Sequence, residues 1–204
     1  MANYTDLTGL AGVAVATAAA VPLLPGIAKL AKSQQARSRL AVLQGAVFAL
    51  MLIPFGAMPF AAYLRGMTGD LSITTLVLSG CAMLRPWMGC AADRQREALL
   101  GMIALAALAF YPMALGAGAY DPYHLGYASL QFVVVLLLLA LAAWSRGQAM
   151  IALCIALATL AWASGWYESG NLWDYLIDPF VAIYALAAMM NFFIRALLKA
   201  GSGR

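Results

Sequence analysis

Runs of about 20 predominantly apolar residues recur along this chain, and no other feature constrains its fold as strongly. A helix that crosses the hydrocarbon core of a membrane needs about 20 such residues. The chain has 65% hydrophobic and 10% charged side chains, whereas soluble domains carry roughly 25% charged residues. This composition excludes a soluble enzyme, a disordered tail, a nucleic-acid-binding module and a disulfide scaffold.

Seven segments have the length and apolarity of membrane spans, and the connections between them are short. We therefore predict an all-α integral membrane protein, a compact bundle of about seven transmembrane helices forming one domain over residues 1–204. The third segment is the weakest because Ser72 and Thr74 interrupt it, and the sequence leaves open whether it spans fully. The predicted spans are residues 8–28, 40–62, 71–87, 98–118, 126–144, 148–166 and 179–197.

The basic residues indicate the orientation of these spans. With seven spans, every Lys and Arg except Arg65 falls on one side of the membrane. The formal net charge of +4 then separates into +9 on that side and −5 on the other. Since basic loops stay in the cytoplasm, we expect the N-terminus outside, the C-terminus in the cytoplasm, and a location in the plasma (bacterial inner) membrane.

The spans themselves carry little chemistry. Pro54 and Pro112 fall well inside their spans and predict helix kinks. No charged residue lies at mid-depth, which counts against a proton-coupled pump with a carboxylate inside the membrane. The sequence has no phosphate-binding loop, metalloprotease motif, nucleophile elbow or mid-span lysine for a retinal. We predict no cofactor.

Aromatic and polar residues gather on the predicted outer side. The only histidine and all nine tyrosines, from Tyr4 to Tyr184, lie in that half. An aromatic belt alone would mark both interfaces, so we interpret two outer loops, residues 120–127 and 166–178, as a surface that binds a partner or a substrate. The candidate residues are Tyr120, Asp121, Tyr123, His124, Tyr127, Trp166, Tyr167, Glu168, Asn171, Trp173, Asp174 and Asp178.

The second loop has helical spacing. Asn171, Asp174 and Asp178 recur at intervals that place them on one face of a helix. We predict a short interfacial helix that leads into Pro179, a residue suited to the first turn of the last span. Asp178, directly before that proline, is expected to cap the span.

Two further outer features follow from local chemistry. Asp121-Pro122 is typical of a turn start, with Gly126 available for the exit. Arg65 is the lone outer cation among six acids, and we expect it to pair with one of them. The outer acids and His124 offer enough donors for a divalent ion, but a single histidine without a paired spacing does not predict a metal site.

Three functions remain open from the sequence. The first is a non-catalytic subunit or assembly protein of a larger membrane complex, which docks other subunits through its acidic, aromatic outer face. The second is a small transporter or channel for a neutral or cationic solute. The third is an outer-leaflet enzyme for a lipid or lipid-linked sugar, using Asp121, His124, Glu168 and Asp174. A pocket between the two loops would favour transport or catalysis, and an open rim would favour docking. The expected surroundings are the lipid bilayer and other membrane proteins, without nucleic acid.

Overall fold

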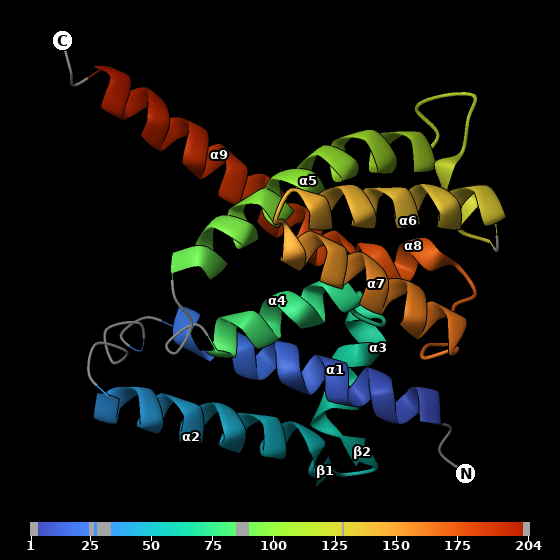
Figure 1. Ribbon diagram of the computed structural model, residues 1–204. Helices are drawn as coiled ribbons and strands as arrows, with labels where there is room; N and C mark the ends of the chain where they lie inside the picture. Colours follow the sequence, from blue (N-terminus) through green and yellow to red (C-terminus); the bar gives the residue numbers. More distant parts are fainter. Residues whose placement is uncertain (1–3, 25–26, 28–33, 85–89, 128, 202–204) are drawn as a thin grey trace.

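The computed structural model describes residues 4–24, 27, 34–84, 90–127 and 129–201, and in this part the chain is helical apart from one small hairpin (Figure 1). The elements in chain order are α1 (Tyr4–Ala20), η1 (Val21–Leu23), α2 (Gln34–Leu52), β1 (Pro54–Phe55), β2 (Met58–Pro59), α3 (Phe60–Thr68), α4 (Ile73–Leu84), α5 (Cys90–Ala114), η4 (Pro122–Gly126), α6 (Leu130–Ser145), α7 (Ala149–Ala163), α8 (Leu172–Leu176) and α9 (Pro179–Gly201).

The helices run back and forth between two ends of the molecule (Figure 1). One group contains α1 packed on α2, α3 and α4, and the other contains α5 packed on α7 and α9, with α6 against α7. Contacts between α4 and α7 join the two groups. At one end α5 and α7 finish, α6 and α9 begin, and η4 and α8 lie between them. We call this end, residues 110–130 and 163–180, the aromatic end.

Three helices are long and apolar enough to cross a membrane, among the residues that the structure describes. They cover Thr5–Leu23, Asp93–Ala114 and Pro179–Lys199. The apolar helices α4, α6 and α7 have only 12, 16 and 15 residues. At 1.5 Å per residue they are about 18 to 24 Å long, less than the hydrocarbon core of about 30 Å. The helical membrane class is supported, and the number of seven spans stays a prediction.

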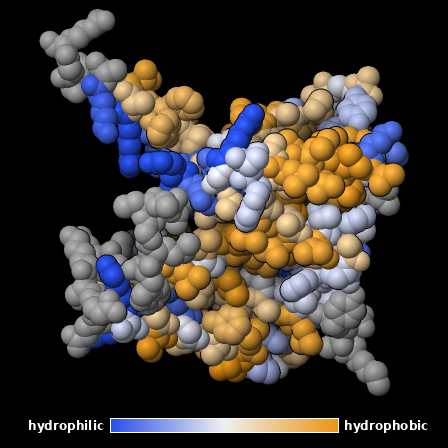
Figure 2. Space-filling view, in the orientation of Figure 1, coloured by the Kyte–Doolittle hydropathy of each residue, from blue (hydrophilic) through white to orange (hydrophobic). Residues whose placement is uncertain are grey.

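The surface also fits a membrane protein. Hydrophobic side chains cover the face formed by α5, α6 and α7 (Figure 2). On α6, Leu137, Leu138 and Leu141 are more than half exposed. A soluble monomer rarely leaves so large an apolar area open to water, so this face is suited to lipid or to another apolar surface.

The kink expected at Pro54 is a complete break in the helix. α2 ends at Leu52, and Pro54 pairs with Pro59 across the β1–β2 hairpin before α3 begins at Phe60. Gly56 turns the hairpin with a φ of 74°, a conformation that favours glycine. Residues 40–62 therefore do not form one helix. Pro112, in contrast, stays inside α5.

Candidate functional site

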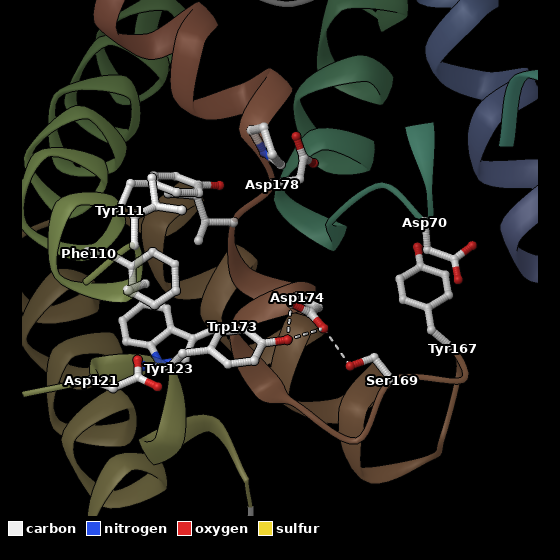
Figure 3. A pocket seen from close by; sticks show the side chains of 14 residues that line it. Asp70, Phe110, Tyr111, Asp121, Tyr123, Tyr167, Ser169, Trp173, Asp174 and Asp178 are labelled. Atoms are coloured by element: carbon white, nitrogen blue, oxygen red, sulfur yellow. Dashed lines mark hydrogen bonds between the residues drawn. The ribbon is translucent and has the colours of Figure 1, made fainter. Parts of the chain in front are cut away.

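The two predicted loops converge on a pocket at the aromatic end (Figure 3). Its volume is about 530 Å³. The lining comes from the end of α5, from η4, from the segment 167–179, and from Asp70 ahead of α4. Residues more than 100 positions apart thus share one cavity. The arrangement is a recess and not a flat rim.

Half of the candidate residues line this pocket. Three are carboxylates and three are aromatic side chains, and they come from both loops. The six are Asp121, Tyr123, Tyr167, Trp173, Asp174 and Asp178.

The other half of the candidates do not line the pocket. Asn171 is fully buried beneath it and has a structural role. Tyr120, Tyr127 and Trp166 are 56%, 57% and 43% exposed. His124 and Glu168 are exposed as well, so the structure does not bring them together with the acids as a catalytic or metal-binding set.

A hydroxyl cluster holds Asp174 in place (Figure 3). The Tyr123 hydroxyl donates to both carboxylate oxygens of Asp174, at 3.2 and 3.1 Å. The Ser169 hydroxyl donates to Oδ2 at 2.5 Å, and its oxygen accepts from the backbone N–H of Asn171 at 3.0 Å. These neutral donors fix the orientation of the carboxylate and leave its charge in the pocket.

Asp178, in the lining of the pocket, connects two helices. Its Oδ1 accepts from the N–H of Val181 at 2.9 Å, which confirms the predicted cap of the last long helix. Its Oδ2 accepts from the N–H of Ser72 at 2.8 Å and from the Thr75 hydroxyl at 2.5 Å. Asp178 is only 5% exposed, and its three bonds tie the start of α9 to the start of α4.

The predicted short helix before Pro179 exists as α8, but the expected common face does not. Asn171 is the N-cap of α8, and its Oδ1 accepts from the N–H of Trp173 at 3.0 Å. Asp178 lies beyond the C-cap residue Ile177, whose backbone is extended. The helix is too short to carry Asn171 and Asp178 on one face, because Asn171 begins it and the chain extends before Asp178.

The junction between η4 and α8 is tightly packed. Asn171 Nδ2 donates to the Tyr123 carbonyl at 3.0 Å, and Trp173 Nε1 donates to the Pro122 carbonyl at 2.9 Å. Asp121 caps η4 by accepting from the N–H of Tyr123, which agrees with the predicted turn start. A side chain at Gly126 would collide with Asn171.

Stacked rings form one wall of the pocket. The indole of Trp173 lies between Phe110 and Phe132, with centroids 4.4 and 4.6 Å away. Opposite, the ring of Tyr167 stacks on that of Tyr175 at 5.1 Å, and the Tyr167 hydroxyl donates to the Leu71 carbonyl at 2.8 Å. These contacts fix the walls of the pocket and cover several aromatic faces.

Arg65 pairs with two of the predicted outer acids. Its guanidinium contacts Asp70 at 2.6 Å and Asp6 at 3.1 Å. These contacts, led by the hydrogen bond to Asp70, raise the pKa of Arg65. Gly9 allows this approach, since a Cβ there would lie 2.4 Å from both Arg65 Nε and Asp70 Oδ1. The pair fastens α1 to the segment that carries Asp70 into the pocket.

Sequence reasoning missed several lining residues. Asp70 was counted only as one of the outer acids, and Tyr111 only as one of the outer tyrosines. Phe110 and Ser169 carried no recognisable signal, since an apolar residue in a span and a serine in a loop are ordinary there. Conversely, Tyr184 does not join the pocket: its hydroxyl accepts a hydrogen bond from Arg96, which the sequence places with the opposite, basic side.

Two phenols at the pocket are held neutral. Burial, with the Asp70 carboxylate as the next cause, raises the pKa of Tyr167 above the ordinary value of about 10. Burial, with Asp174 as the next cause, likewise raises the pKa of Tyr123. In the unfolded chain these phenols ionise near pH 10, at a lower pH than in the folded protein. Their contribution to the free energy of unfolding is therefore complete below about pH 10 and is lost as the pH rises further.

We therefore expect Tyr123 and Tyr167 to form phenolates only at a higher pH than free tyrosine does, as measured by ultraviolet absorbance in detergent. The free energy of unfolding should fall as the pH rises above about 10, and this fall should be shallower in Tyr167→Phe. Titration of all described tyrosines at the pH of free tyrosine would contradict this expectation.

No protein-family model, curated protein or solved structure matches this chain. Among the described residues, no group of three or more His, Cys, Asp or Glu side chains lies close enough to hold a metal ion. The pocket at the aromatic end is thus the candidate functional site of the described residues.

Proposed function

We propose that this chain is an integral membrane protein that binds a small solute in the pocket at its aromatic end and carries it across the bilayer, as a transporter or channel. The observation behind this proposal is the convergence of loops 120–127 and 166–178 on a recess of about 530 Å³. Small-molecule sites are concave, mostly apolar and largely preformed, with volumes of roughly 300 to 1,000 Å³. The hydrogen bonds at Asp174 and Asp178 keep the recess preformed.

We further propose seven spans, with the pocket outside and the C-terminus in the cytoplasm of the cell that bears it. The separation of charge into +9 and −5 supports this orientation. The alternating helix directions in Figure 1 are compatible with it. The shorter helices α4, α6 and α7 would require local thinning of the bilayer or flanking side chains that reach its interface.

Flux into proteoliposomes tests the transport proposal. Purified protein in phosphatidylethanolamine–phosphatidylglycerol vesicles would be offered a mixture of neutral and cationic metabolites, and the vesicle contents would be measured by mass spectrometry. We expect at least one solute to accumulate above empty vesicles, to fall to background with Asp174→Asn, and to persist with the exposed control Glu168→Gln. Accumulation no greater than in empty vesicles would overturn the proposal.

A second candidate is a docking subunit of a membrane complex. It is favoured by the exposed aromatic side chains Tyr120, Tyr127 and Trp166 of the two loops, because aromatic residues are enriched in protein interfaces. Gentle purification in detergent should then yield a partner in stoichiometric amount that is lost on Trp166→Ala. A chain that purifies alone would contradict docking and leave the transport proposal standing.

The enzyme alternative receives less support. Of its four polar residues, His124 and Glu168 are exposed outside the pocket. Asp121 and Asp174 remain in the lining, where Asp121 accepts from the Tyr123 N–H and Asp174 accepts from the Tyr123 and Ser169 hydroxyls, so neither exposed residue takes part in their hydrogen bonds. The geometry thus favours binding over chemistry.

A further inference from the structure

The pocket contains more negative charge than the protein neutralises. Its described lining includes four carboxylates, at Asp70, Asp121, Asp174 and Asp178, and no Lys, Arg or His. Asp70 is paired with Arg65. Within the described part of the chain, no salt bridge reaches the other three acids. A site that presents uncompensated acids in a recess attracts a cation.

The three carboxylates without a salt bridge differ in their burial and in the donors that hold them. Both oxygens of Asp178 are used by two backbone N–H groups and the Thr75 hydroxyl, and the side chain is buried. Asp121 is exposed, and its Oδ1 accepts from the N–H of Tyr123 to cap η4. Asp174 lies on the pocket wall between Tyr123 and Ser169 (Figure 3), partly buried and held by hydroxyl donors alone. It is the best-positioned anchor for a bound cation.

Asp174 also acts on the neighbouring phenol of Tyr123. After burial, the charge of Asp174 is the next cause that raises the pKa of this phenol. A neutral hydroxyl can orient a carboxylate but cannot cancel its charge, whereas a positively charged ligand can do both.

The walls indicate which kind of cation fits. A quaternary ammonium group is recognised mainly by open aromatic faces. Here both faces of Trp173 are covered, by Phe110 and Phe132, and one face of Tyr167 is covered by Tyr175. The pocket instead offers oxygen acceptors, which bind an ammonium group through its N–H donors.

Much of the rest of the lining is apolar. It includes Ala114, Leu115, Ile177 and Pro179. A ligand with an ammonium head and a compact hydrocarbon or aromatic body would place its charge at Asp174 and its body against these residues. Burial of that body adds to the affinity, because it removes apolar surface from water.

We propose that the pocket binds protonated primary amines with a compact apolar body, with the ammonium group bonded to Asp174. This assignment rests on the solute-binding part of the proposed function and names its ligand class. The described lining does not bring three ligating side chains around one point, which distinguishes it from a divalent metal site.

Calorimetric titration of the purified full chain in detergent tests the assignment with three probes that share a phenethyl body and differ in the head group. Phenethylamine carries the N–H donors and the charge, trimethyl(phenethyl)ammonium carries only the charge, and phenethyl alcohol carries neither. We expect phenethylamine to bind at least about tenfold more tightly than either analogue. Equal binding of phenethyl alcohol overturns the cationic class, and tighter binding of the trimethylated probe overturns the preference for N–H donors.

Variants locate the anchor. Asp174→Asn preserves shape and should weaken phenethylamine binding at least about tenfold, while binding to Glu168→Gln stays unchanged. An unchanged affinity in a folded Asp174→Asn protein would overturn Asp174 as the anchor. If Asp174→Asn fails to fold, the probe series on the unaltered chain still decides the ligand class. Amine binding without flux would contradict only the transport proposal. Flux of neutral solutes without a preference for amines would contradict only the assignment of the ligand class.

Discussion

Replacing Asp178 by alanine should destabilise the protein by about 3 to 5 kcal/mol, since each buried donor left without an acceptor costs about 1 to 3 kcal/mol. The substitution removes the acceptor of the Ser72 and Val181 N–H groups and of the Thr75 hydroxyl. Only 5% of Asp178 is exposed, so water cannot readily replace the carboxylate. Unfolding in mixed micelles with increasing denaturing detergent measures the change.

The matched control is Glu168→Ala, which removes an exposed carboxylate from the same end of the molecule. Its effect should stay within about 0.5 kcal/mol. Asp178→Asn retains Oδ1 as the acceptor for Val181 and should lie between the two. If Asp178→Ala unfolds at the same detergent fraction as Glu168→Ala, the bridge between α4 and α9 does not hold the fold together.

The second large effect is expected at Gly126, where the chain has no room for a side chain. A Cβ there would lie 1.7 Å from Asn171 Oδ1, 2.6 Å from Asn171 Cγ and 2.9 Å from Trp173 Cδ1. Because Asn171 caps α8 and is fully buried, it has nowhere to move. Gly126→Ala should cost about 1 to 3 kcal/mol, as overpacking does, and should disturb the Trp173 wall of the pocket.

Thermal unfolding and the near-ultraviolet circular dichroism of the tryptophans test this expectation. Gly170→Ala is the control, since a Cβ at Gly170 meets nothing within 4 Å. We expect Gly126→Ala to lower the unfolding temperature and change the tryptophan signal, and Gly170→Ala to leave both unchanged. Identical behaviour of the two variants would show that η4 and α8 do not depend on this close contact.

The sequence predicted the features that act over a few residues. Asp178 caps the helix that begins one residue later, and Asp121 caps η4 in the same way. The short helix ahead of Pro179 follows from local spacing as well. The pairing of Arg65 with outer acids was also expected, because a single cation among six anions has few alternatives.

The lengths of the helices were less predictable. Hydropathy extended the second span across Pro54, but the structure ends α2 at Leu52 and inserts a hairpin. The segments 71–87, 126–144 and 148–166 contain helices of 12, 16 and 15 residues. Apolarity reports which residues avoid water, and it does not report where backbone hydrogen bonding of a helix stops.

The pocket could not be predicted from the sequence, because its lining residues lie far apart along the chain. Asp70 and Asp174 lie more than 100 residues apart, and Phe110 enters from a third segment. The packing of α4, α5 and α9 decides which of the six acids pairs with Arg65, which accepts hydrogen bonds from hydroxyls and which is buried. Contacts between such distant residues produce no periodic pattern in the sequence.

The sequence by itself determined the helical membrane class and the caps of single helices, and it predicts the side on which charge and aromatic residues gather. These follow from hydropathy, from the cost of moving charge across lipid, and from hydrogen bonds between neighbours. Tertiary structure alone decided that two loops close a recess, that His124 stays outside it, and that Asp174 faces it without a cation. Those outcomes depend on long-range packing, in which each position is set by residues far along the chain.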